Sequence, residues 1–103
     1  MPATPDPAPV PLPVGDWLRP LIGEVVVADL AEFYLVIGIL VAASDAHLEF
    51  READLHDHRE ANSSKEVYVL ESRTIGVRVN RARLWVPRRQ VVAISLITDV
   101  VVG

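Results

Sequence analysis

Basic and aromatic side chains gather in the second half of the 103-residue sequence, where they could contact an anionic partner. Guanidinium groups bind phosphates, and an indole ring offers a stacking surface for a base. The candidate residues for contact with a nucleic acid or with a neighbouring subunit are Arg78, Arg83, Trp85, Arg88 and Arg89. As a nucleic-acid site, this group predicts binding of single-stranded RNA.

The division of charge along the chain offers a second interpretation. Residues 1–64 hold 3 Arg against 11 acidic residues, whereas residues 65–103 hold 7 Lys or Arg against 3 acidic residues. The arginines would then pair with the acidic half of the same or a neighbouring subunit, and Trp85 would be partly buried in the core. The net charge of −4 also argues against a protein that coats DNA or an anionic membrane by bulk charge.

Histidines and carboxylates are concentrated in residues 45–66, which hold 3 His and 7 acidic residues. His56 and His58 would share one face of a strand, so with a carboxylate such as Asp54 they could hold a divalent ion. No third ligand stands at a fixed spacing, so we expect a solvated loop edge, no metal and no cofactor. Glu49, Glu52 and Asp54 are likewise not placed as an acid–base pair.

The motifs of common enzymes are absent from the sequence. There is no Gly-rich phosphate loop, no nucleophile elbow and no zinc-protease helix. The sequence has no cysteine, which excludes disulfides, thiolate zinc sites and cysteine nucleophiles. We therefore expect a protein that is not an enzyme and has no small-molecule substrate.

The longest apolar run, residues 33–43, is half the length that a membrane helix requires, so we expect a core strand and no membrane partner. The N-terminus shows neither the basic segment nor the apolar stretch of a signal peptide, and we expect a cytoplasmic protein. Six of the 8 prolines alternate with other residues between positions 2 and 13. Residues 1–14 are therefore expected to be a disordered Pro-rich tail, either a solubilising leader or a docking peptide, outside a domain of residues 15–103.

The first half of that domain predicts a short helix and three strands. Asp16 is placed to cap a short helix whose apolar residues face the core and which ends at Gly23. Residues 24–30 and 33–43 are dense in β-branched residues and predict a hairpin with its turn at 29–32. Gly38 marks a bend in the second strand. Residues 48–55 predict a third strand that bulges near Glu52, with its charged residues solvated.

The second half predicts a helix over residues 64–75, with Ser63 and Glu66 as a capping box and Gly76 as the C-cap. Val67, Leu70 and Ile75 would face inward, with Ser72 outside; residues 67–70 could instead form a strand. A fourth strand is expected over 77–86 and a fifth over 91–97, which residues 99–102 could extend. The fifth strand carries apolar residues on both faces, so one face must meet something other than its own core.

The spacing of two glycines and of the apolar strand residues matches a known small barrel. The matching residues are Gly23, Val26, Ala28, Leu30, Gly38, Leu40 and Asp45 near the start, and Leu84, Val86, Val91 and Ile94 near the end. In these, the sequence resembles the Sm and Sm-like (LSm) family over residues 16–50 and 84–97. The resemblance implies a mainly β fold, an Sm-like small bent five-stranded barrel with a short N-terminal helix. The predicted helix is then an inserted helix between strands three and four, in a connection longer than the usual loop of the family.

Two departures from the family concern its nucleotide-binding residues. The first family motif carries a base-binding asparagine after the acidic turn, where this chain reads Ala46, His47, Leu48. The second motif carries Arg-Gly after a hydrophobic residue, where this chain reads Val86, Pro87, Arg88. We therefore expect a non-catalytic, homo-oligomeric assembly or scaffold module whose edge strands pair, and the resemblance adds that it could form a ring. The alternative is a single-stranded RNA-binding Sm-like protein.

Overall fold

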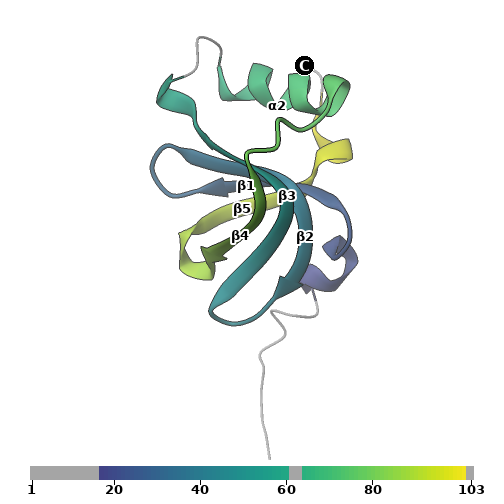
Figure 1. Cartoon of the computed structure of the whole chain (residues 1–103), viewed down its shortest axis with the longest axis vertical. Coiled ribbons are helices and arrows are strands. Elements are labelled where there is room, and N and C mark those ends of the chain that lie inside the picture. The colour runs from purple at the N-terminus through teal and green to yellow at the C-terminus, as the bar shows by residue number, and fades with distance from the viewer. Residues whose placement is uncertain (1–16, 61–63, 102–103) are drawn as a thin grey trace, which may run out of the picture.

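The computed structural model describes residues 17–60 and 64–101. The expected Pro-rich tail, residues 1–14, lies outside the described residues, as do Asp16 and Ser63. Five strands form one antiparallel sheet in the order β4-β3-β2-β1-β5. They are β1 (Val25–Leu30), β2 (Tyr34–Ala43), β3 (His47–Asp57), β4 (Arg81–Pro87) and β5 (Val91–Leu96). The sheet bends strongly on itself into the small barrel that the sequence predicted (Figure 1).

The sheet bends at the middle of the β2–β3 pair, next to Gly38. Ile37 pairs with Asp54 and Ile39 with Arg51, so two residues of β3 lie opposite Gly38 alone. Glu52, one of these two, has a φ of 48°. A Cβ on Gly38 would lie 2.9 Å from both Cα and Cβ of Ala53. The predicted bend at Gly38 and the predicted bulge at Glu52 are therefore two sides of one feature.

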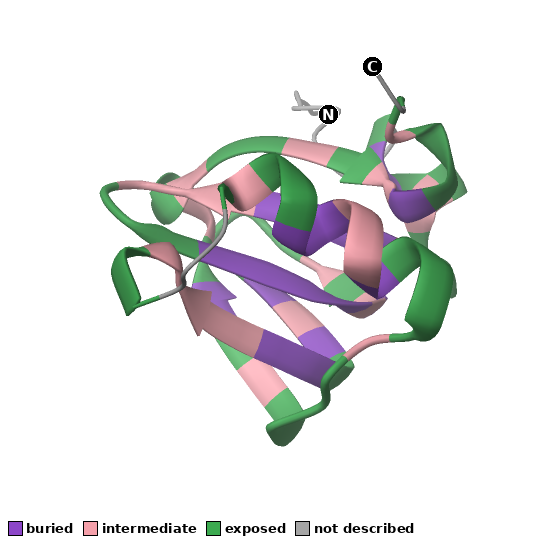
Figure 2. Cartoon of the chain, turned by 90° about the horizontal axis from the view of Figure 1, so that it is seen from above, coloured by how far each residue is buried: buried purple, intermediate pink, exposed green. Residues whose placement is uncertain are grey.

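The two faces of the sheet carry two separate hydrophobic clusters. The interior cluster lies within the bend and is formed by Val26, Ala28, Val36, Leu40, Leu48, Phe50, Ala53 and Val86. The outer cluster lies between the other face and the helix α2 (Lys65–Ile75), and is formed by Val27, Leu35, Ile37, Tyr68, Val69 and Ile97. Figure 2 shows the buried strand residues beneath α2. Successive residues of β1 and β2 alternate between the clusters, so these central strands are buried on both faces.

Helix α2 confirms the predicted helix over its strand alternative, but its buried face differs from the prediction. Ser64, rather than Ser63, is the N-cap, and its Oγ accepts a hydrogen bond from the Val67 N–H at 3.2 Å. Gly76 ends the helix with a φ of 122°. The buried residues are Tyr68, Val69 and Ser72, whereas Val67 and Ile75, expected inside, are 43% and 78% exposed. Compared with the prediction, the helix turns a different face toward the sheet, because the Tyr68 hydroxyl hydrogen-bonds to the buried Asp54 of β3.

Two further boundaries differ from the prediction. Residues 77–80 are not part of β4. In place of a backbone hydrogen bond between strands, the Asn80 Oδ1 accepts a hydrogen bond from the Leu55 N–H at 3.0 Å. After β5 the chain turns into the 3₁₀ helix η4 (Ile97–Asp99), so the expected extension of the strand is wrong for the described residues. At the start, Trp17 and Leu18 are helical and lead into η1 (Arg19–Leu21). Leu18 is buried there, but Trp17 is exposed, contrary to the prediction.

The hairpin turn between β1 and β2 covers residues 31–33, so it overlaps the predicted turn at 29–32 but begins two residues later. A 3₁₀ helix, η2 (His58–Glu60), follows β3, and another, η3 (Arg88–Gln90), joins β4 to β5. Within the described ranges, no helix is both long enough and apolar enough to cross a membrane.

Candidate functional site

The two outer strands of the sheet, β4 and β5, are its free edges. Each pairs on one side only, β4 with β3 and β5 with β1, in the part of the chain that the structure describes. The other side of each strand presents backbone N–H and C=O groups that another strand could pair with. β4 and β5 are consecutive in the sequence and joined by η3 alone, so one edge strand ends and the other begins at the same three-residue turn.

The edge at β4 is basic and aromatic. Arg81, Arg83 and Trp85 alternate along its exposed face, and Trp85 is 55% exposed. The guanidinium carbon of Arg83 lies 5.1 Å from the centre of the Trp85 ring, and Arg83 Nε lies 3.1 Å from Glu49 Oε2. The interpretation of Trp85 as partly buried core is therefore wrong, whereas Arg83 does pair with an acidic residue of the first half.

The edge at β5 is apolar. Val91, Ile94 and Leu96 pack against the interior cluster, while Val92 is 73% exposed. The register with β1 shifts between Asp29 and Leu30, which leaves Val92 without a paired residue in that strand. This bulge turns Val92 outward and explains how a strand with apolar residues on both faces is accommodated.

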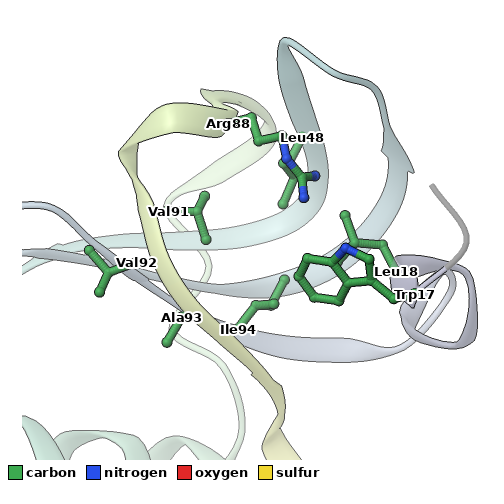
Figure 3. Close-up of a pocket in the computed structure, with 8 residues that line it drawn as sticks. All are labelled: Trp17, Leu18, Leu48, Arg88, Val91, Val92, Ala93 and Ile94. Carbon is green, nitrogen blue, oxygen red and sulfur yellow. The ribbon is translucent and has the colours of Figure 1, made fainter. Parts of the chain in front are cut away.

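A groove of about 410 Å³ runs along the interior side of this edge (Figure 3). Trp17 and Leu18 form one wall, Val91 and Ile94 the other, and Arg88 lies over Leu48 between them. The guanidinium carbon of Arg88 is 5.5 Å from the centre of the Trp17 ring. Its Nη1 is buried and finds no hydrogen-bond acceptor among residues 17–60 and 64–101. The groove is therefore mainly apolar, with one guanidinium nitrogen whose N–H groups have no acceptor in the described residues.

The five predicted contact residues do not form a single site. Arg83 with Trp85 and Arg88 with Trp17 form two separate cation–π pairs, the first on β4 and the second between η3 and the residues before η1. Arg89 is exposed in η3. Arg78 lies apart, over the Tyr68 ring at 4.8 Å, with its Nη2 2.9 Å from Glu71 Oε1. The hydrogen bond to Glu71 raises the pKa of Arg78, followed in effect by the contact with Tyr68.

A polar cluster that sequence reasoning missed attaches α2 to the sheet. Asp54 is 1% exposed, although the sequence placed it on a solvated face. Its Oδ2 accepts a hydrogen bond from the Tyr68 hydroxyl, and its Oδ1 accepts one from Asn80 Nδ2 at 3.0 Å. The His56 ring stacks on Tyr68 with the ring centres 3.7 Å apart. Burial raises the pKa of Tyr68, and the hydrogen bond to Asp54 raises it further.

This cluster also contains two of the three candidate metal ligands, Asp54 and His56. Asp54 and His56 are occupied by Tyr68, whereas His58 lies in η2, with its ring centre 5.9 Å from that of Phe33. Within the described ranges, no three His, Asp or Glu side chains form a group that could hold a metal ion. Asp54 is therefore engaged by hydrogen bonds within the fold, whereas His56 is held by stacking and its buried Nε2 has no hydrogen-bond partner among the described residues.

No family model matches the sequence, and no curated protein matches it. The chain is similar to solved structures. In the crystal structure of the NatC complex bound to CoA, the matched chain is 24% identical with a TM-score of 0.52, over 77% of this chain and 82% of that chain. The Sm protein of Pyrococcus abyssii in complex with a uridine heptamer is 14% identical with a TM-score of 0.56, over 81% and 96%. These likenesses show the fold: this chain is an Sm-like small barrel.

Proposed function

We propose that this chain is a non-catalytic assembly module that builds a homo-oligomer by pairing β4 of one copy with β5 of the next. The observation that carries the proposal is that both edge strands have a free backbone side within the described part of the chain. A strand added to such an edge satisfies its open N–H and C=O groups. Because each copy offers one edge of each kind, the contact is head-to-tail and can close into a ring.

The side chains at the two edges support a contact between unlike surfaces. β4 brings Arg81 and Arg83, and β5 has no charged residue, so pairing of the two does not place like charges opposite each other. Val92 is 73% exposed, and a strand added beside β5 would cover part of its side chain. An exposed apolar edge of this kind is rare on a soluble monomer.

The placement of Glu49 and Asp54, two of the three candidate acid–base residues, supports a role without catalysis. Glu49 lies within 3.8 Å of Arg51 and 3.1 Å of Arg83, so its charge is shared with two guanidinium groups. Asp54 is buried beneath α2 with Tyr68 and Asn80 as its donors. General acid–base chemistry needs a carboxylate that reaches a bound substrate, and these two are engaged in the fold.

A pair of lysine substitutions tests the edge contact. Val92→Lys places a charge on the free edge of β5, and Ile75→Lys places the same charge at a similarly exposed position of α2. We expect Val92→Lys to reduce the mass measured by light scattering toward that of one chain, while Ile75→Lys leaves the oligomer intact. Equal masses for both variants and the unmodified chain would contradict pairing at β5.

A second candidate function is binding of single-stranded RNA. It is favoured by the two arginine–tryptophan pairs, Arg83 with Trp85 and Arg88 with Trp17, and by the similarity to an Sm protein solved with a uridine heptamer. The chain lacks the asparagine and the Arg-Gly of the family motifs, which is why we place this function second. Oligo-uridine binding that weakens steeply with salt would support it, and the absence of binding at low salt would exclude it.

A further inference from the structure

A second groove lies on the outer face of the sheet, between the free edge of β5 and helix α2. Its apolar lining comes from Val27 of β1, Val69 and Leu70 of the helix, Val92 and Ala93 of β5, and Val100 and Val101 after η4. Val92 and Val101 are 73% and 81% exposed. Apolar side chains gathered in this way beside an unpaired edge mark a contact surface.

The edge at β4 carries a side chain of matching character on the same face. Trp85 points away from the interior cluster, whereas its neighbours Leu84 and Val86 pack against or within it. If β4 of one copy extends the sheet at β5 of the next, side chains of one face continue on that face. Leu84 and Ile94 both belong to the interior side, so an antiparallel register that pairs them places Trp85 opposite Ala93, in the groove.

Charge complementarity also favours a second copy as the occupant. β4 carries Arg81 and Arg83 and no acidic residue. The rim of the groove carries two carboxylates, Asp29 and Glu66, against one ammonium group, that of Lys65, which lies 2.7 Å from Asp29. Arg83 is paired with Glu49 of its own chain, so Arg81 is the cation of β4 that meets the net negative rim and favours this orientation.

We propose that Trp85 of one copy inserts into the groove between β5 and α2 of the next copy, which makes the inserted helix the element of self-recognition. This inference rests on the proposed edge pairing and adds the anchor residue and its receptor to it. The indole ring supplies a large apolar area at the centre of the contact, where Leu70 of the helix and Val101 after η4 line the groove.

The test uses the fluorescence of Trp85, because the chain has only 2 Trp. In a Trp17→Phe background, Trp85 is the sole indole, and its emission can be followed while the protein is diluted from the oligomer to the monomer. We expect the oligomer to show a blue-shifted emission and protection from acrylamide quenching, both lost on dilution. Val101→Lys in the groove should abolish both, while Ile75→Lys, with a similar exposure outside the groove, should not.

The outcomes separate this inference from the proposed function. If the oligomer forms but Trp85 stays red-shifted and quenched as in the monomer, edge pairing stands and the insertion of Trp85 is wrong. The same conclusion follows if Val101→Lys leaves the emission of the oligomer unchanged. If no oligomer forms at any concentration in either the unmodified chain or the Trp17→Phe variant, the proposed function itself fails.

Discussion

The hydroxyl of Tyr68 donates a hydrogen bond to Asp54, a carboxylate in β3 that is almost completely buried beneath helix α2. Asn80 supplies the second donor to this carboxylate, and the His56 ring covers Tyr68 by stacking. The inserted helix is therefore held by a polar contact as well as by the outer cluster. Its position decides whether the groove beside β5 exists.

Tyr68→Phe removes one of the two donors to Asp54 and keeps the ring that packs against the sheet. A buried carboxylate that loses a donor costs about 1–3 kcal/mol in the free energy of unfolding. Urea unfolding followed by circular dichroism measures this loss. The control is Tyr34→Phe at the other tyrosine, a half-exposed residue, where a much smaller effect is expected. Equal effects of the two variants would show that the Tyr68 hydroxyl is not needed to hold α2.

The raised pKa of Tyr68 predicts a loss of stability at alkaline pH. The folded chain holds the phenolic proton more tightly than the unfolded chain, whose tyrosine has a pKa near 10. The stabilising contribution is therefore complete below pH 10 and disappears as the pH rises through the higher pKa of the folded state. Unfolding experiments between pH 8 and about 11 should show this decline, and Tyr68→Phe should reduce its slope. An unchanged slope in the variant would assign the decline to other groups.

Gly38→Val tests the bend of the barrel. Its Cβ would lie 2.9 Å from the Cα of Ala53, a backbone atom that cannot move without displacing β3. We expect a cost of about 2 kcal/mol or more in the free energy of unfolding. Gly38→Ala combined with Ala53→Gly should recover part of the cost of Gly38→Ala alone, because one of the two clashing atoms is removed. A fully stable Gly38→Val variant would mean that β2 and β3 do not approach this closely.

Deletion of residues 1–14 tests the domain boundary that the sequence predicts. The alternating prolines of this segment cannot donate hydrogen bonds to a sheet, so we expect the melting temperature to change by no more than a few degrees. Thermal unfolding of the full and the shortened chain measures the difference. A larger decrease would place part of the tail within the folded domain.

The sequence predicted the features that depend on neighbouring residues. The β1–β2 hairpin follows from two β-branched runs around one polar turn, and Gly38 and Glu52 marked the bend and the bulge that face each other. The buried face of α2 could not be predicted in this way. The bulge at Glu52 keeps Ala53 and Leu55 on the interior side and places Asp54 on the outer face, as the polar–apolar pattern of β3 predicts, but α2 covers that face at Asp54. Its donor, Tyr68, is 14 residues away in the chain.

The contacts of the candidate residues could likewise be predicted only between residues that are close in the sequence. Arg83 and Trp85 are two residues apart in one strand, so their shared face follows from strand geometry. The partner of Arg88 is Trp17, from the opposite end of the chain, and no local pattern connects them. Arg78 appeared to belong with the other arginines because of its position in the sequence. The irregular segment before β4 instead places it over Tyr68.

Edge pairing is tested most directly by the mass of the unmodified chain in solution, measured by light scattering coupled to size exclusion at micromolar concentrations. Pairing of β4 with β5 between copies predicts a homo-oligomer larger than a dimer, in the absence of any nucleic acid. A monodisperse monomer throughout this range, with Val92→Lys causing no change, would contradict the assembly function.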